Sequence, residues 1–149
     1  SAYTLFWLSA WAPDDDYDIV HWNNGQWDTC YMPYGRIHTL LPVYLDEQKR
    51  IAEILRRKAR RLIFATTTPV WPNQFETAAV RGRKNEDIAA YNRAVTDMLG
   101  RLGVAINDLN TAVSRDIHQY IVGEDKVHLS PAGVELCAGL VSEALMKPH

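Results

Sequence analysis

The chain has 149 residues, a formal net charge of −2 at pH 7 and 47% hydrophobic residues. This length fits one domain, residues 1–149, and the apolar fraction is sufficient for a core. The nearly neutral charge argues against nucleic acid or an acidic membrane surface as the main partner, because both require a basic face. No apolar run approaches the ~20 residues of a membrane-spanning helix.

The first residues, Ser1-Ala-Tyr-Thr-Leu-Phe-Trp, include neither an initiator methionine nor a basic signal-peptide region. We therefore interpret the sequence as the inner part of a longer protein, which leaves the cellular compartment open. The two cysteines, Cys30 and Cys137, are too few for a disulfide scaffold. One bridge and two free thiols are both compatible with the sequence.

Helices and strands are expected to alternate along the chain, which is typical of a parallel sheet with helices on both faces. The first helix is expected over residues 2–12 and ends before Pro13, and a buried strand follows over 17–22. After a loop over 29–42 comes a long helix over 43–60. Its expected apolar stripe is Leu45, Ile51, Leu55 and Ala59.

The second half continues the alternation with a strand over 62–67, a helix over 85–102, a strand over 104–109 and a short helix over 110–119. Gly103 follows the helix in the position that glycine favours. Three strands alone would leave one edge of the sheet uncovered.

The last helix has a well-defined start, with Ser130 as N-cap and Pro131 in the first turn. Its expected core stripe is Val134, Cys137, Val141 and Leu145.

Asp125 lies three residues before His128, in a loop that opens onto this last helix. A hydrolase needs an imidazole that takes a proton from a serine and a carboxylate that orients the imidazole. A short loop can bring both side chains together. The spacing also occurs by chance, so a surface Asp beside a structural His is the alternative interpretation.

The segment Asp125-Lys126-Val127-His128-Leu129-Ser130, followed by Gly133, resembles the last conserved block of the SGNH (GDSL-like) hydrolases. Residues 17–28 resemble the strand that leads to the family's Gly-x-Asn-Asp block, and residues 65–70 resemble the next strand with its Pro-containing exit. Asn92 resembles the Asn of a recurrent helix motif. The resemblance covers nearly the whole chain. It implies a flavodoxin-like, three-layer α/β/α fold, an Asp125–His128 pair that completes a Ser-His-Asp triad, and no metal or organic cofactor.

The sequence departs from the family pattern because the Gly-Asp-Ser block with the nucleophile has no match. The resemblance implies that a segment with the first two strands and the serine is missing here or is supplied as another chain. A second departure is Trp27, which stands where the family has its oxyanion Asn. Asn23 and Asn24 are the nearest replacements, with Asn24 favoured, because side chains of a strand alternate and only one is expected to point inward. The alternative is that they only cap the turn.

Four aromatic residues fall in loops after strands, where open parallel sheets bind ligands. They are Trp27, Tyr31, Tyr34 and Trp71. Flat rings suit the faces of sugars, and ordinary loop packing is the alternative. Arg36 and Arg81 lie in the same loops and are candidates to contact an anionic sugar.

Other candidate sites have less support. Ser1 suits a helix N-cap better than a nucleophile, and no motif surrounds Cys30 as a thiol nucleophile. The histidines lack the spacing of metal ligands, so we expect no metal site. Those considered were His21, His38, His118 and His128.

The sequence therefore predicts a serine esterase that removes acyl groups, most simply acetyl groups, from a carbohydrate. Two alternatives stay open. One is a non-catalytic protein on the same fold that binds a carbohydrate or a partner, which the missing serine block and Trp27 favour. The other is a lipase, thioesterase or acyltransferase activity.

Overall fold

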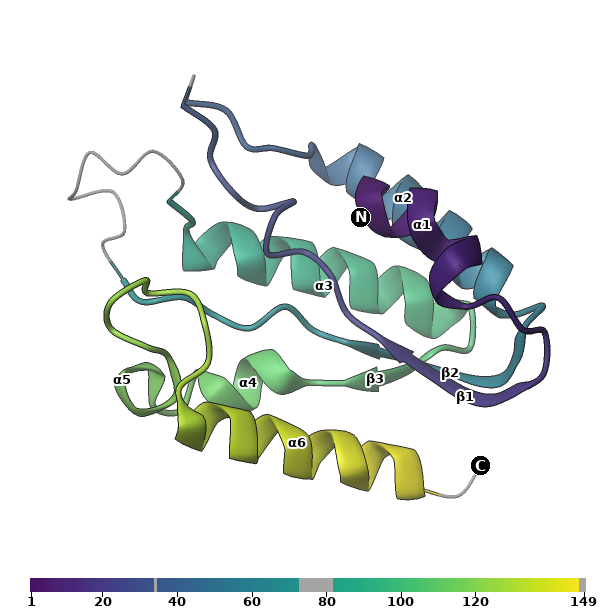
Figure 1. The fold of residues 1–149 in the computed structure, drawn as a ribbon. Coiled ribbons are helices and arrows are strands. Elements are labelled where there is room, and N and C mark those ends of the chain that lie inside the picture. Colours follow the sequence, from purple (N-terminus) through teal and green to yellow (C-terminus); the bar gives the residue numbers. More distant parts are fainter. Residues whose placement is uncertain (34, 73–81, 148–149) are drawn as a thin grey trace.

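The computed structural model describes residues 1–33, 35–72 and 82–147. The described residues include a three-stranded parallel sheet with the strand order β1-β2-β3. Strand β1 is Tyr17–Trp22, β2 is Ala59–Ala65 and β3 is Ala105–Asn107. The predicted α/β architecture with a parallel sheet between helical layers is confirmed (Figure 1).

Helices cover both faces of the sheet (Figure 1). One face carries α1 (Ala2–Trp11), α2 (Leu41–Leu55) and α3 (Asn85–Arg101); the other carries α6 (Pro131–Met146), with α4 (Leu109–Val113) and α5 (Ile117–Tyr120) beside its start. Each layer buries its own core. Tyr44, Ile51, Phe64 and Leu99 belong to the first core, and Val113, Ile121 and Cys137 to the second.

Strand β2 begins earlier than the sequence predicted, and α2 ends earlier. Residues 59 and 60 were expected at the end of a helix over 43–60, but α2 ends at Leu55 and Ala59 pairs with Tyr17. The amide of Tyr17 also donates to the carbonyl of Lys58 at 2.9 Å. Pairing with β1 thus extends β2 into a basic segment that resembles a helix end on its own, because tertiary contacts override local propensity.

The segment after β3 is also more divided than expected. The strand predicted over 104–109 is confined to Ala105–Asn107, and the helix predicted over 110–119 is two short helices. Asp108 and Asp116 act as their N-caps and accept hydrogen bonds from the amides of Thr111 and Gln119. Two aspartates at this spacing restart the helix because each satisfies amides that are free at a helix start.

Helix α6 has the predicted start, but its buried face differs from the predicted stripe. Ser130 caps the helix and accepts a hydrogen bond from the amide of Gly133 at 3.1 Å. Val134 is 54% exposed and Leu145 is 38% exposed, so these two predictions are wrong. A Cβ at Gly133 would lie 2.2 Å from the carbonyl oxygen of Tyr120. This close approach fixes the rotation of α6. The residues that face the core are Gly133, Leu136, Cys137, Leu140 and Ala144.

Within the described residues, β1 pairs only with β2, so its other edge is free, as the sequence predicted. Helix α1 adjoins this side of the molecule and buries only Leu8. Its large side chains are mostly exposed: Tyr3, Phe6, Trp7 and Trp11. The described residues therefore present an unpaired strand edge next to an apolar helix.

Candidate active site

Asp125 and His128 form a hydrogen-bonded pair in the loop between α5 and α6. Nδ1 of His128 lies 2.5 Å from Oδ2 of Asp125. The loop lies at the end of the molecule where the chain leaves the three strands, which is their carboxyl end (Figure 1). The side chain of His128 is 82% exposed, and that of Asp125 is 47% exposed. Because Asp125 occupies Nδ1, the other ring nitrogen of His128 is left for a substrate or a nucleophile.

The carboxylate of Asp125 is held ionised by the backbone of its own loop. Its Oδ1 accepts hydrogen bonds from the amides of His128 at 2.9 Å and Val127 at 2.8 Å. These bonds, first that from His128, lower the pKa of Asp125 to about 2. The carboxylate is therefore charged at neutral pH and suited to orient the imidazole.

Trp71 packs against the Asp125–His128 loop and is hydrogen-bonded to it. Its amide donates to the carbonyl of Lys126 at 3.0 Å, and its Nε1 donates to the carbonyl of Ile117 at 3.1 Å. A Cβ at Gly123 would lie 2.8 Å from the Trp71 ring, so the glycine is needed for this contact. Lys126 has a φ of 62°, which turns the chain between Asp125 and His128. Trp71 was predicted to bind substrate. In the structure its half-buried ring packs against the loop and against His118, and substrate contact stays a prediction.

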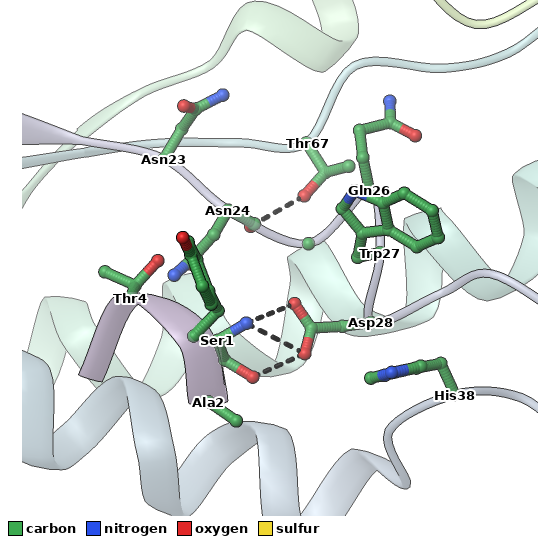
Figure 2. A pocket seen from close by; sticks show the side chains of 12 residues that line it. Ser1, Ala2, Thr4, Asn23, Asn24, Gln26, Trp27, Asp28, His38 and Thr67 are labelled. Carbon is green, nitrogen blue, oxygen red and sulfur yellow. Dashed lines mark hydrogen bonds and ion pairs between the residues drawn. The ribbon is translucent and has the colours of Figure 1, made fainter. Parts of the chain in front are cut away.

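A pocket of about 510 Å³ lies beside the carboxyl end of β1. It is bounded by the start of α1, the turn that follows β1, and Thr67 at the exit of β2 (Figure 2). The buried carboxylate of Asp28 lies in it and accepts a hydrogen bond from the nitrogen of Ser1 at 2.8 Å. The hydroxyl of Ser1 lies between the carboxylates of Asp28 and Glu47, so Ser1 stands at the N-cap as expected but its side chain does not cap the helix.

Asn23 and Asn24 point to different sides of the chain, as Figure 2 shows. Asn23 is exposed, whereas Asn24 is half-buried. Nδ2 of Asn24 is buried and has no hydrogen-bond partner in the described residues. The expectation that only one of the two amides points inward is met, and Asn24 is the inward one. Its role in catalysis stays a prediction.

The orientation of the Asn24 amide follows from a chain of hydrogen bonds. The indole of Trp22 can only donate, and it donates to Oε1 of Gln48 at 3.2 Å. Nε2 of the fully buried Gln48 must therefore be the group that donates to Oδ1 of Asn24. Within the described part of the chain, this leaves Nδ2 of Asn24 as a donor without an acceptor beside the pocket.

Gly25 allows the turn after β1 to approach β2. It has a φ of +139°, and a Cβ would lie 2.1 Å from Oγ1 of Thr67. The hydroxyl of Thr67 donates to the carbonyl of Asn24 at 3.1 Å. Asn92 in turn binds Thr67 with both ends of its amide, at 2.9 Å each. The helix motif around Asn92 thus fixes the strand exit that supports Asn24.

Two of the predicted substrate-binding rings differ in their surroundings. Trp27 is 54% exposed at the pocket, with the guanidinium of Arg83 5.8 Å from its ring centroid. Tyr31 is half-buried, and its hydroxyl donates to Asp87 at 2.9 Å. Burial, followed by Asp87, raises the pKa of Tyr31. The structure thus leaves Trp27 accessible and gives Tyr31 structural contacts.

Several other predictions can be placed. Arg36 is exposed, and Tyr34 and Arg81 lie outside the described residues. Both cysteines are buried free thiols, which settles the choice left open by the sequence. In the part of the chain that the structure describes, no three His, Cys, Asp or Glu side chains gather as metal ligands, and no helix is long and apolar enough to cross a bilayer.

Comparison with known proteins gives matches in structure only. No family model and no curated protein sequence matches the chain. A lipase/acylhydrolase from Enterococcus faecalis superposes with a TM-score of 0.69 at 18% identity, and the match covers 86% of this chain and 60% of that one. An acetylxylan esterase from Geobacillus stearothermophilus gives 0.68 at 17% identity, with 88% and 60% covered. A member of the lipolytic G-D-S-L family from Veillonella parvula gives 0.68 at 16% identity, with 98% and 73% covered.

The chain has the fold of the SGNH (GDSL-like) hydrolases. It spans about 60% of the length of the first two structures. The fold that the sequence motifs implied is confirmed. At this level of identity, the likeness establishes the fold, and the chemistry must be argued from the residues.

Within this SGNH hydrolase fold, sequence reasoning missed the residues that support the site. Gln48 looked like an ordinary polar residue of an amphipathic helix, yet it is fully buried and orients Asn24. Arg83 lies between the strand predicted over 62–67 and the helix predicted over 85–102, yet it is only 9% exposed. Neither had a sequence signal, because their partners are distant in the chain.

Proposed function

We propose that this chain is the C-terminal part of a serine esterase, and the Asp125–His128 pair at the carboxyl end of the sheet carries the proposal. His128 would take the proton of the serine as it attacks the ester carbonyl and would then return a proton to the leaving alcohol. Asp125 holds Nδ1 of the ring, which leaves the other nitrogen in the correct tautomer for the serine.

Asn24 is the proposed oxyanion donor. Its Nδ2 is a preoriented amide group beside the pocket without a protein partner among the described residues. Such a donor stabilises the negative charge that develops on the carbonyl oxygen in the tetrahedral intermediate, because no reorganisation is needed at that moment. Asn23, which is exposed on the other side of the chain, is the weaker candidate.

The nucleophilic serine is proposed to come from a segment that precedes Ser1 in the full protein, present in the same chain or as a bound fragment. Three observations support this origin. The solved structures of the same fold are longer than this chain. The outer edge of β1 is free within the described residues, and the adjoining α1 exposes four aromatic side chains. An added strand would pair the edge and cover apolar surface.

The proposed substrate is an acetyl ester on a carbohydrate. The exposed indole of Trp27 at the pocket is suited to lie against a sugar face, with Arg83 near its ring. One solved protein of similar fold is an acetylxylan esterase. Lipase, thioesterase and acyltransferase activities use the same residues, so a panel of acetylated oligosaccharides and long-chain acyl esters separates them.

The test uses the full-length protein, with the residues that precede Ser1, and p-nitrophenyl acetate as substrate. We expect His128→Ala to lower kcat at least about 10³-fold, and Asp125→Asn at least about 10²-fold. Glu124→Gln is the matched control, since it removes one exposed negative charge next to Asp125 and should retain the wild-type rate. Equal rates for wild type and His128→Ala would overturn the esterase proposal and favour a non-catalytic binding protein.

A further inference from the structure

Arg83 lies in a short segment whose backbone is fixed on both sides. The carbonyl of Gly82 accepts a hydrogen bond from the amide of Tyr31 at 2.9 Å. Asn85 binds the backbone of Val70 with both ends of its side-chain amide, at 2.9 and 2.8 Å. The position of Arg83, two residues before α3, is therefore set by the hydrogen bonds of its neighbours to Tyr31 and Val70.

The guanidinium of Arg83 is directed inward. The residue is only 9% exposed, and its Nε donates to the carbonyl of Gln26 at 2.5 Å. Its Cζ lies 5.8 Å from the ring centroid of Trp27. Burying a guanidinium costs free energy unless the group is hydrogen-bonded and faces negative charge. The hydrogen bond to Gln26 therefore helps to hold the Arg83 side chain in this buried position.

These contacts belong to a network that joins the two halves of the site. Gln26 donates from Nε2 to the carbonyl of Thr68 at 2.9 Å, and the amide of Trp71 donates to the carbonyl of Lys126 at 3.0 Å. The segment 68–71 thus lies between the turn after β1 and the Asp125–His128 loop. Asn85 fastens the same segment next to Arg83.

We propose that Arg83 is a positioning residue that holds the turn of residues 25–28 in register with the Asp125–His128 loop. The inference rests on the proposed esterase function. Its first contribution is mechanical, because the bond to Gln26 fixes the backbone between Asn24 and Trp27. Its second is electrostatic. Burial lowers the pKa of Arg83, and Cys30 and then the carboxylate of Asp125 oppose this lowering.

The experiment compares Arg83→Met, Arg83→Lys and Arg93→Met in the full-length protein. Arg93 is the matched control, because it is an exposed arginine on α3, the helix that follows Arg83. Backbone hydrogen exchange is measured for residues 25–28 and 125–128. We expect Arg83→Met to exchange about 10-fold faster or more in both segments, because a hydrogen bond to a charged group is lost. Arg83→Lys retains the charge without the planar fork, so it should loosen residues 25–28 and leave 125–128 close to wild type.

Kinetics with p-nitrophenyl acetate provide the second measurement. Arg83→Met should lower kcat about 10- to 100-fold with little change in KM, whereas Arg83→Lys should recover part of the lost kcat. Wild-type exchange at 125–128 in Arg83→Met, or a kcat equal to that of Arg93→Met, would overturn the proposal. If the wild-type protein hydrolyses no ester, the esterase proposal fails, while the exchange comparison still decides whether Arg83 couples the two segments.

Discussion

Gln48 donates a hydrogen bond to Oδ1 of Asn24 and thereby leaves Nδ2 of Asn24 as a buried donor beside the pocket, without a partner among the residues that the structure describes. The indole of Trp22 donates to Oε1 of Gln48 and thereby fixes the orientation of the Gln48 amide. A buried donor without a partner is unfavourable in the free protein and becomes useful when a ligand supplies the acceptor. This arrangement distinguishes Asn24 from its exposed neighbour Asn23.

Asn24→Ala is expected to lower kcat about 10²- to 10³-fold with a small effect on KM, because an oxyanion donor acts mainly in the transition state. Asn23→Ala is the matched control and should change kcat less than about 3-fold. Steady-state kinetics of the full-length protein on p-nitrophenyl acetate measure both. Equal losses in the two variants would show that the amide of Asn24 is not the oxyanion donor.

The pKa of Asp125 is about 2, against an ordinary value of 3.8, so the stability of the fold should depend on pH in the acidic range. A folded-state pKa below the unfolded value stabilises the fold above about pH 4, and this stabilisation is lost as the pH falls from about 3.8 to about 2. Because the side chain is half-exposed, we expect solvent screening to limit the contribution to about 1 kcal/mol.

Urea unfolding of wild type and Asp125→Asn at several pH values measures this contribution. The difference in the free energy of unfolding should be constant near neutral pH and should shrink below about pH 4. A difference that grows as the pH falls would contradict the assignment of the pKa shift.

Gly25→Ala should destabilise the protein by about 2–4 kcal/mol, because the new Cβ meets Oγ1 of Thr67 and the backbone has a positive φ. Gly139→Ala is the control, since it lies in α6 with open space around it and should stabilise by about 0.5–1 kcal/mol. Urea denaturation at pH 7 measures both. A Gly25→Ala protein as stable as wild type would mean that the turn approaches β2 less closely.

Trp27 and Trp71 should respond differently to replacement by Ala. Trp27→Ala is expected to raise KM for acetylated oligosaccharides about 10-fold and to leave p-nitrophenyl acetate hydrolysis nearly unchanged, because only a sugar uses the exposed ring. Trp71→Ala should lower kcat for both substrates and destabilise the protein by about 2 kcal/mol, because the Asp125–His128 loop loses its support. Identical profiles for the two variants would contradict this division of roles.

Local patterns in the sequence determine a large part of the fold of this protein. The alternation of apolar runs specifies a parallel sheet between helices, and the Ser130–Pro131 start of α6 is visible because capping depends on neighbouring residues. Asp125 and His128 could be paired from sequence for the same reason, since one short loop carries both.

The tertiary structure decided what depends on distant partners. The start of β2 follows from the pairing of Ala59 with Tyr17, and the buried face of α6 follows from the approach of Gly133 to Tyr120. The choice of Asn24 over Asn23 and the inward course of Arg83 depend on Gln48 and Gln26, which lie 24 and 57 residues away. A sequence pattern records the preference of each residue for its neighbours, whereas these features arise from contacts that exist only after the sheet and its helices have packed.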